Sequence, residues 1–173
     1  QRQMCIRDRN SGGGQRGLAL GNYLTVKGEE AVAVGTNASA TADWAIAMGK
    51  NSKAEKETAM AFGYDSHAKV NHGVALGAWS VADTAAGASG YDPSTQAAST
   101  DTSAAWKSTL GAVSVGDKTE GYTRQITNVA AGTQDTDAVN VAQLKKAVAG
   151  AADGNDTLVS DNNALSLSGK TLS

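Results

Sequence analysis

The sequence predicts a mostly β fold, a parallel solenoid in which each coil is built by one 14-residue repeat. Three observations predict it: an apolar motif recurs five times at a constant spacing, large and small residues alternate within each motif, and aromatic residues make up only 5% of the chain. A fixed period with one strand-like motif per copy is typical of repeats that bury their apolar faces against their neighbours. The five motifs are Leu18-Ala19-Leu20-Gly21, Val32-Ala33-Val34-Gly35, Ile46-Ala47-Met48-Gly49, Met60-Ala61-Phe62-Gly63 and Val74-Ala75-Leu76-Gly77.

The strand that precedes each glycine is apolar on both faces. Counted back from the glycine, the third and first residues before it are large, whereas the fourth and second are mostly alanine. Successive side chains of a strand point to opposite faces, so both faces must be covered. We expect the alanine side to face the interior of the coil and the large side to contact other copies of the chain. The predicted contact residues are Val32, Val34, Ile46, Met48, Met60, Phe62, Val74 and Leu76.

A second, shorter strand follows each glycine. Small residues stand three and five positions after the glycine with a polar residue between them, as in Ser52-Lys53-Ala54. This pattern predicts that the second strand has one buried face and one solvent-exposed face. Five positions before the glycine the residue type varies freely, which predicts an exposed corner of the coil. We expect Trp44 and Trp79 to be exposed, and we interpret them as packing residues rather than ligand contacts.

The 14-residue period stops after Gly77, and a similar motif returns only at Val113-Ser114-Val115-Gly116. The stretch between them, which includes the turn motif Gly90-Tyr91-Asp92-Pro93, is interpreted as an insertion that projects from the stack before one last coil. The predicted segments are 10–89 for the head repeats, 90–118 for the insert and last coil, 119–137 for a neck, 138–152 for the start of a coiled coil and 153–173 for the next stalk module.

A helix is expected near the C-terminal end. Asp135-Thr136-Asp137 supplies capping residues and negative charge at its predicted start, and Asp153-Gly154 is expected to stop it. Between them, apolar residues recur at the alternating spacing of a coiled-coil seam. The seam residues are Val141, Leu144, Val148 and Ala151, and the first three are predicted contacts between chains.

Residues 1–9 differ from the rest of the chain. They are highly charged and contain Cys5, the single cysteine. We interpret this segment as a non-native scar of sequence assembly and exclude it from the fold. The formal net charge is −2, which gives no basic surface for nucleic acid. No apolar run approaches the roughly 18 residues of a membrane-spanning helix.

The segments Tyr122 to Gly132 and Asp137 to Lys145, together with the 14-residue repeats, resemble the head and neck of trimeric autotransporter adhesins, of the kind seen in the Yersinia adhesin head. The Gly90 to Gly116 segment resembles the head insert of that family. This resemblance implies a left-handed parallel β-roll, a homotrimer of three rolls packed side by side, and a neck that narrows onto a coiled coil. Left-handed coiling is opposite to the usual right-handed crossover of parallel strands, and it is implied by the resemblance alone. The resemblance also implies a bacterial surface fibre of a longer protein, whose outer-membrane anchor is expected only in a missing C-terminal part.

Four motifs could carry chemistry, and each is incomplete. Gly12 to Gly17 matches G-x-G-x-x-G but follows no predicted strand. Ser66-His67-Ala68-Lys69 matches S-x-x-K without its companion motifs. His67 and His72 are too few for a zinc site, and Asp153 to Asp156 lacks the central glycine and terminal glutamate of a calcium loop. We therefore expect no catalytic residue, no cofactor and no metal.

The leading functional hypothesis is attachment to host or extracellular-matrix components, or to other cells, through a multivalent trimeric surface. Two alternative hypotheses also describe fibrous proteins. One is a structural spacer that holds another binding domain away from the cell surface, and the other is a segment of a trimeric phage fibre. A third is an acyltransferase of the solenoid type, but such enzymes use six-residue repeats and a catalytic histidine in an interchain groove.

Overall fold

The computed structural model describes residues 16–155, 158–161 and 164–167. The proposed scar at 1–9, with Cys5, and most of the Gly12 to Gly17 motif lie outside the described residues. The chain divides into two compact units, Gln1–Gln125 and Ile126–Ser173, which are described separately.

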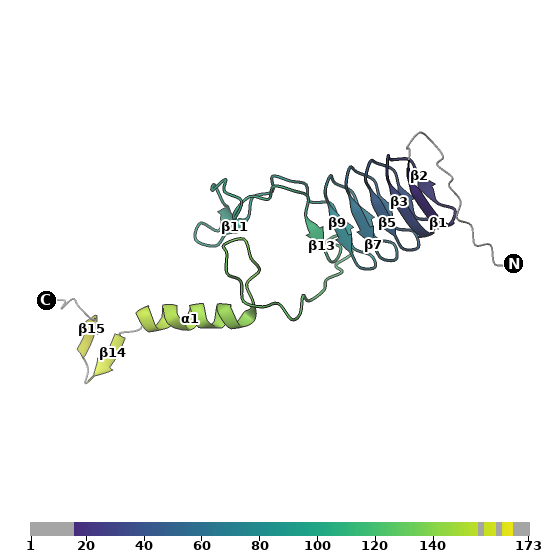
Figure 1. The fold of residues 1–173 in the computed structure, drawn as a ribbon. Helices are drawn as coiled ribbons and strands as arrows, with labels where there is room; N and C mark the ends of the chain where they lie inside the picture. The colour runs from purple at the N-terminus through teal and green to yellow at the C-terminus, as the bar shows by residue number, and fades with distance from the viewer. Residues whose placement is uncertain (1–15, 156–157, 162–163, 168–173) are drawn as a thin grey trace. The chain divides into compact units, whose positions relative to one another are not determined.

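The first unit is a parallel β-solenoid (Figure 1), which confirms the predicted fold. One side is a six-stranded sheet in the order β1-β3-β5-β7-β9-β13, and the other is a five-stranded sheet in the order β10-β8-β6-β4-β2. The strands of the first sheet are β1 (Leu18–Asn22), β3 (Val32–Thr36), β5 (Ile46–Met48), β7 (Met60–Phe62), β9 (Val74–Leu76) and β13 (Val113–Ser114). Those of the second are β2 (Thr25–Val26), β4 (Ser39–Ala40), β6 (Lys53–Ala54), β8 (His67–Ala68) and β10 (Val81–Ala82).

Each coil places every residue over its counterpart 14 positions earlier. Leu18 pairs with Val32, and Ile46 pairs with Met60. The register survives the insertion, because Val113 pairs with Val74 in a parallel ladder although 39 positions separate them. The stack is therefore extended by a sixth strand that the chain delivers after the insert.

The interior between the two sheets is lined with small side chains, as predicted. The core residues are alanines together with Val26, which is the largest apolar side chain that is fully buried. Ser52, Ser66 and Ser80 are also fully buried. Each of these hydroxyls donates to a nearby main-chain carbonyl, at 2.9 Å in all three cases, so the buried polar atoms are satisfied.

The repeating glycine is required by close contact between coils. At Gly49 φ is +139°, and a Cβ atom there would lie 2.3 Å from the carbonyl oxygen of Gly63. No side chain fits at that distance or favours that backbone conformation. The glycine therefore lets neighbouring coils approach where the chain leaves the first sheet.

Both corners of each coil have left-handed backbone at residues other than glycine. One corner lies two positions after the glycine and the other five positions before the next one, and φ at these residues lies between +52° and +65°. The residues are Tyr23, Asn37, Asn51, Asp65 and Trp79 at the first corner, and Arg16, Glu30, Trp44, Thr58 and His72 at the second. Five of these ten had been recognised from sequence as a variable corner, but their conformation had not.

The insert between β10 and β13 carries its own antiparallel hairpin, β11 (Tyr91–Asp92) with β12 (Ala97–Ala98). Its two limbs are further joined by an antiparallel bridge between Ser89 and Lys107. The predicted turn motif at Gly90 to Pro93 thus lies at the start of this hairpin.

The second unit contains α1 (Val141–Asn155) and a hairpin of β14 (Leu158–Asp161) and β15 (Ala164–Leu167). The predicted helix bounds were wrong at both ends. The helix begins after Asn140 rather than after the acidic Asp135 to Asp137 segment, and it continues through Asp153 and Gly154. A glycine costs a helix only about 1 kcal/mol, which does not force it to end. Among the described residues, no helix has the length and apolar character that crossing a membrane requires.

Candidate functional site

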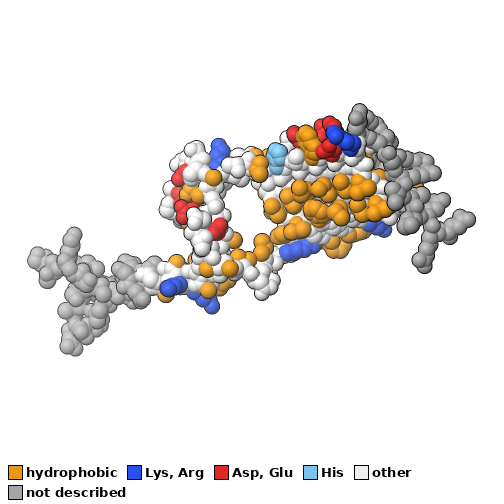
Figure 2. Space-filling model, viewed as in Figure 1, with side chains coloured by type: hydrophobic (Ala, Val, Ile, Leu, Met, Phe, Trp, Pro, Cys, Tyr) orange, Lys and Arg blue, Asp and Glu red, His pale blue; other side chains and the backbone are white. Residues whose placement is uncertain are grey.

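The outward side of the six-stranded sheet forms a continuous apolar surface, here called the apolar face (Figure 2). It consists of the large residues one and three positions before each glycine and ends at Val113. Leu18, Met48 and Leu76 are 48%, 41% and 49% exposed, and Val113 is 64% exposed. The predicted contact residues Val32, Val34, Ile46, Met60, Phe62 and Val74 lie half-buried on the same face. Contiguous apolar surfaces of this kind mark interaction sites in soluble proteins.

The outward side of the five-stranded sheet differs sharply in character. Ser39, Lys53 and His67 occupy equivalent positions in neighbouring strands, paired in register. Lys53 is exposed, and the other two are half-buried. The solenoid therefore has one apolar and one mainly polar outer surface, as the alternation of residue types predicted.

A second apolar surface follows one side of α1. Val141, Leu144 and Val148 are 68%, 58% and 60% exposed, at the predicted three- and four-residue spacing. The side chain of Ala151, the fourth predicted seam residue, lies outside the described residues. This spacing is that of a coiled-coil seam.

A network of hydrogen bonds fixes the neck segment to the start of α1. The side-chain oxygen of Asn140 accepts a hydrogen bond from the main-chain N–H of Gln143 at 3.0 Å. In return, the side-chain oxygen of Gln143 accepts one from the main-chain N–H of Asn140 at 3.3 Å. This reciprocal pair is a capping box. The Gln143 amide also bonds to both main-chain groups of Gly132, each at 3.0 Å, and Asn140 donates to the carbonyl of Val129 at 3.2 Å.

Asp137 closes the neck loop instead of capping the helix. Its carboxylate accepts from the main-chain N–H groups of Thr133 at 2.8 Å and Gln134 at 3.0 Å. These hydrogen bonds hold the pKa of Asp137 below its ordinary value, first through Thr133 and then through Gln134. No role was assigned to Asn140 and Gln143 from the sequence, so their role in the neck was missed.

Arg124 closes the last coil of the solenoid. Its guanidinium donates to the Ser80 hydroxyl at 3.0 Å, to the carbonyl of Ala78 at 2.6 Å and to the carbonyl of Val115. These acceptors lie in two successive coils, so one side chain joins the last head repeat to the coil added after the insert. Sequence reasoning missed Arg124, because its partner Ser80 is 44 positions away.

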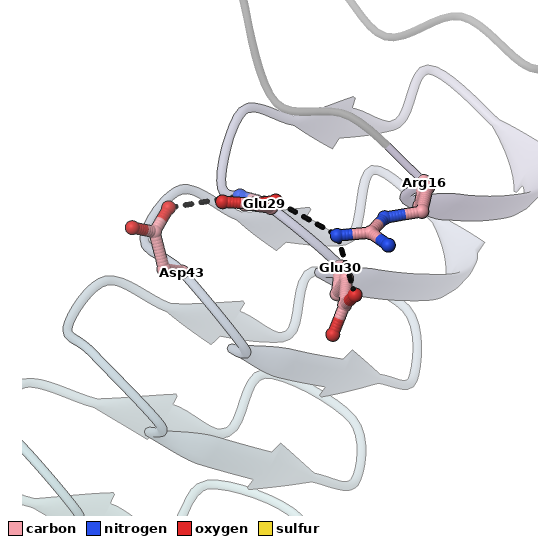
Figure 3. A network of polar contacts seen from close by, with 4 residues as sticks. All are labelled: Arg16, Glu29, Glu30 and Asp43. Carbon is pink, nitrogen blue, oxygen red and sulfur yellow. Dashed lines mark hydrogen bonds and ion pairs between the residues drawn. The ribbon is translucent and has the colours of Figure 1, made fainter.

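Both tryptophans that were expected at corners are exposed, Trp44 to 47% and Trp79 to 49%. Trp79 packs edge-on against Tyr64 with ring centroids 5.6 Å apart, and against Tyr122 at 5.9 Å. The second corner carries an ionic network at its N-terminal end (Figure 3). Arg16 lies 3.0 Å from both Glu29 and Glu30, and Asp43 accepts from the N–H of Glu29 at 2.8 Å.

The motifs considered for chemistry are not assembled into a site. The Ser66 hydroxyl is buried and donates to the carbonyl of Gly63, whereas Lys69 is exposed. His67 lies 2.9 Å from the carboxylate of Glu55, and His72 bonds to the hydroxyl of Thr58. Within the described part of the chain, no group of three or more His, Cys, Asp and Glu residues could hold a metal ion. The side chains of the Asp153 to Asp156 segment lie outside it.

Comparison with known proteins identifies both units. Residues 27–52 and 54–80 match the family described as the YadA head domain repeat, and residues 125–166 match the coiled stalk of trimeric autotransporter adhesin. Together these matches cover more than half of the chain.

Two curated relatives are similar in sequence. Autotransporter adhesin BadA of Bartonella henselae is 55% identical over 100 residues, which is 56% of this chain and 3% of that protein. Trimeric autotransporter adhesin AtaA of Acinetobacter sp. (strain Tol 5) is 56% identical over 68 residues, which is 38% of this chain and 2% of that protein. The chain thus spans a very small part of either relative.

Among solved structures, the collagen-binding domain of the Yersinia adhesin YadA is 29% identical, with a TM-score of 0.46 over 75% of this chain and 73% of that one. The sequence matches carry the assignment: the repeats are head repeats, and the helix begins a stalk. The chain therefore belongs to the trimeric autotransporter adhesins, of which it is a YadA-like segment of head and coiled stalk.

Proposed function

We propose that this chain forms a homotrimer on the bacterial cell surface and attaches the cell to a host extracellular-matrix or cell-surface component. The apolar face carries the proposal. It places residues such as Met48 and Leu76 in water on a single chain, where a soluble protein would normally cover them. A second copy of the same face offers the complementary surface.

The helix supports a three-chain assembly. Its exposed seam of Val141, Leu144 and Val148 needs partner helices, and coiled coils provide them by packing each seam residue between residues of a facing helix. In this proposal the predicted contact residues of the solenoid and of the helix lie at interfaces between the same three chains. Within the second unit, the neck network fixes the segment that contains Val129 and Gly132 to the start of this helix.

The attachment role rests on family membership and on multivalency. One relative of known structure is titled a collagen-binding domain, and we extend a matrix-binding role of this general kind to the present chain. Three chains with repeated coils present each weak contact many times, which raises the overall strength of attachment. An outer-membrane anchor elsewhere in a longer protein completes the proposal, which assigns the chain no catalytic activity and no cofactor.

Two measurements test it. Light scattering after size exclusion should give a mass about three times the 17.5 kDa of one chain. The purified trimer should then bind to surfaces coated with collagen or with other matrix proteins, but not to albumin. A folded monomer would contradict the assembly, and a stable trimer that binds none of the coated surfaces would favour the spacer alternative.

A further inference from the structure

A cavity of about 390 Å³ opens beside the polar outer surface of the solenoid. Its floor includes Lys53, His67 and Val81, the outward residues of β6, β8 and β10, which stack in register. These side chains point away from the coil interior and therefore away from the apolar face on the other sheet. Copies of the chain that cover the apolar face therefore need not cover this cavity.

Aromatic rings form one wall of this cavity. Trp79 and Tyr122 both line it, and Tyr64 packs edge-on against Trp79 from the neighbouring coil. Trp79 and Tyr122 pack against each other with ring centroids 5.9 Å apart. Even so, the two residues remain 49% and 47% exposed to solvent. The side chains that a ligand would meet are thus ordered before it binds, which reduces the entropic cost of binding.

The turn that carries Tyr122 is itself well fixed. Asp117 and Tyr122 exchange two main-chain hydrogen bonds of 2.9 Å, and the Asp117 carboxylate accepts from the N–H of Thr119 at 2.8 Å. Lys118 bridges to Asp83 at 3.0 Å. Arg124, two residues beyond Tyr122, is held by Ser80 and Ala78. The wall is therefore built by several independent contacts.

Trp79 lies at a left-handed corner of its coil. Its φ is +57°, in the left-handed region that disfavours large side chains. At the same corner other coils place Asn37, Asn51 and Asp65, residue types that tolerate this conformation, and one coil places Tyr23. The Asn37 side chain even donates to that of Asn51 at 3.1 Å. Trp79 is 49% exposed, so beyond the packing role expected from sequence its side chain stays available to a ligand.

The polar groups around the aromatic wall are mixed in charge. Asn51 and Lys53 offer donors, while three carboxylates, those of Asp65, Asp117 and Glu120, offer acceptors. The three carboxylates would repel an anion, and Lys53 would weaken the binding of a cation. A sugar fits both features, because its hydroxyl groups donate and accept while one side of its ring presents C–H groups to an aromatic face.

The geometry points to a binding site for neutral oligosaccharides, with one sugar ring stacked on Trp79 and its hydroxyls bonded to the surrounding amide, ammonium and carboxylate groups. The volume lies in the range of small-molecule sites and accommodates a short glycan segment rather than a protein surface. The inference rests on the proposed attachment function for its biological use, and it supplies that function with a ligand class.

The test uses the whole chain and defined sugars. Trp44→Phe and Trp106→Phe together leave Trp79 as the single tryptophan, whose emission is followed while N-acetyllactosamine or chitotriose is added. Parallel titrations use 3′-sialyllactose as an anion and N-acetylarginine amide as a cation. We expect saturable changes with the neutral sugars, at affinities at least about fivefold higher than with either charged probe.

Calorimetry on single variants locates the site. Trp79→Asn, which places the residue of two other coils at this corner, should retain the fold and lose sugar affinity at least tenfold. The matched control is Trp44→Asn, an equally exposed tryptophan at the opposite corner with the same backbone conformation, which should bind as before. Circular dichroism and solution mass establish that both variants are folded.

The outcomes separate this site from the proposed attachment. If no neutral sugar changes the emission of Trp79, or if Trp44→Asn weakens binding as much as Trp79→Asn, the sugar site is wrong. A response to the arginine probe alone would overturn it in favour of a basic peptide ligand. Trimer formation and matrix binding without sugar binding would refute only the site, whereas sugar binding without matrix attachment would refute only the attachment.

Discussion

Replacing Met48 by aspartate tests the assignment of the apolar face. Met48 lies in β5 at the centre of this face, where it pairs with Val34 of β3 and Phe62 of β7. In the single chain it is 41% exposed. An interface that covers the six-stranded sheet must therefore cover Met48. We expect Met48→Asp to abolish the trimer.

The magnitude follows from burial. Full burial of a methionine side chain is worth about 1.5–3 kcal/mol, so covering the exposed 41% contributes about 1 kcal/mol per chain. The larger effect comes from the new carboxylate, since removing a charge from water costs several kcal/mol even after the protein relaxes. Three chains multiply both effects to roughly 10 kcal/mol or more. A loss of this size exceeds the binding free energy of about 8 kcal/mol that corresponds to a micromolar dissociation constant, so the trimer should not form.

Light scattering over a range of concentrations provides the assay, with two controls. Met48→Leu conserves an apolar side chain of similar volume and should leave the trimer intact. Lys69→Asp introduces the same carboxylate, with an even larger change of charge because a lysine is lost, at an exposed position beyond β8 on the other side of the solenoid, and it should also leave the trimer intact. A Met48→Asp protein that keeps the trimer mass and the melting temperature of the parent chain would refute the assignment of this face.

Three further predictions concern the parts that hold the solenoid and the neck. Gly49→Ala should destabilise the protein by about 3 kcal/mol or more in urea unfolding, because its Cβ would lie 2.3 Å from the oxygen of Gly63 at a φ of +139°; a change below about 0.5 kcal/mol would contradict the close contact. Arg124→Lys should speed amide hydrogen exchange in β9 and β13 but not in β3, because an ammonium cannot replace a guanidinium that bonds to Ser80, Ala78 and Val115. An equal change in exchange rate along the whole stack would show that Arg124 does not stabilise the last coil. The neck loop should loosen in acid: because the folded pKa of Asp137 is lowered from 3.8, its stabilisation is complete above that pH and is lost as the pH falls through the folded value. A carboxyl titration of Asp137 at or above 3.8, followed by NMR, would contradict this.

The sequence was sufficient to predict the strands of the solenoid and the direction of their side chains. Alternation of size within one motif separates Ala47 from its neighbours Ile46 and Met48, and the pleat of a strand turns that alternation into two faces. Repetition then excludes accidental matches, because the same separation recurs in every coil. The same logic found the seam of α1, where three- and four-residue spacing carries the information.

Features that depend on contacts distant in sequence, or on backbone conformation without a glycine, were not predictable in this way. The left-handed corners at Trp44 and Asn51 are imposed by the tight stacking of coils, which overrides the preference of the individual residue. The start of α1 was misplaced because several acidic and amide residues near it could cap a helix. Only the structure shows that Asn140 pairs with Gln143 while Asp137 serves the loop before them.

The distribution of apolar residues inverts the usual arrangement of a globular protein, and this has a consequence for stability. The interior is filled by alanine and serine, with Val26 as its largest fully buried side chain, whereas Leu20, Met48 and Leu76 lie outside. Hydrophobic stabilisation scales with the apolar area removed from water, and an alanine offers little of it. A single chain therefore depends mainly on its ladder hydrogen bonds, each of which contributes a modest net amount. Most of the apolar area that this sequence can bury becomes available only when several chains meet, so folding and assembly are expected to stabilise each other.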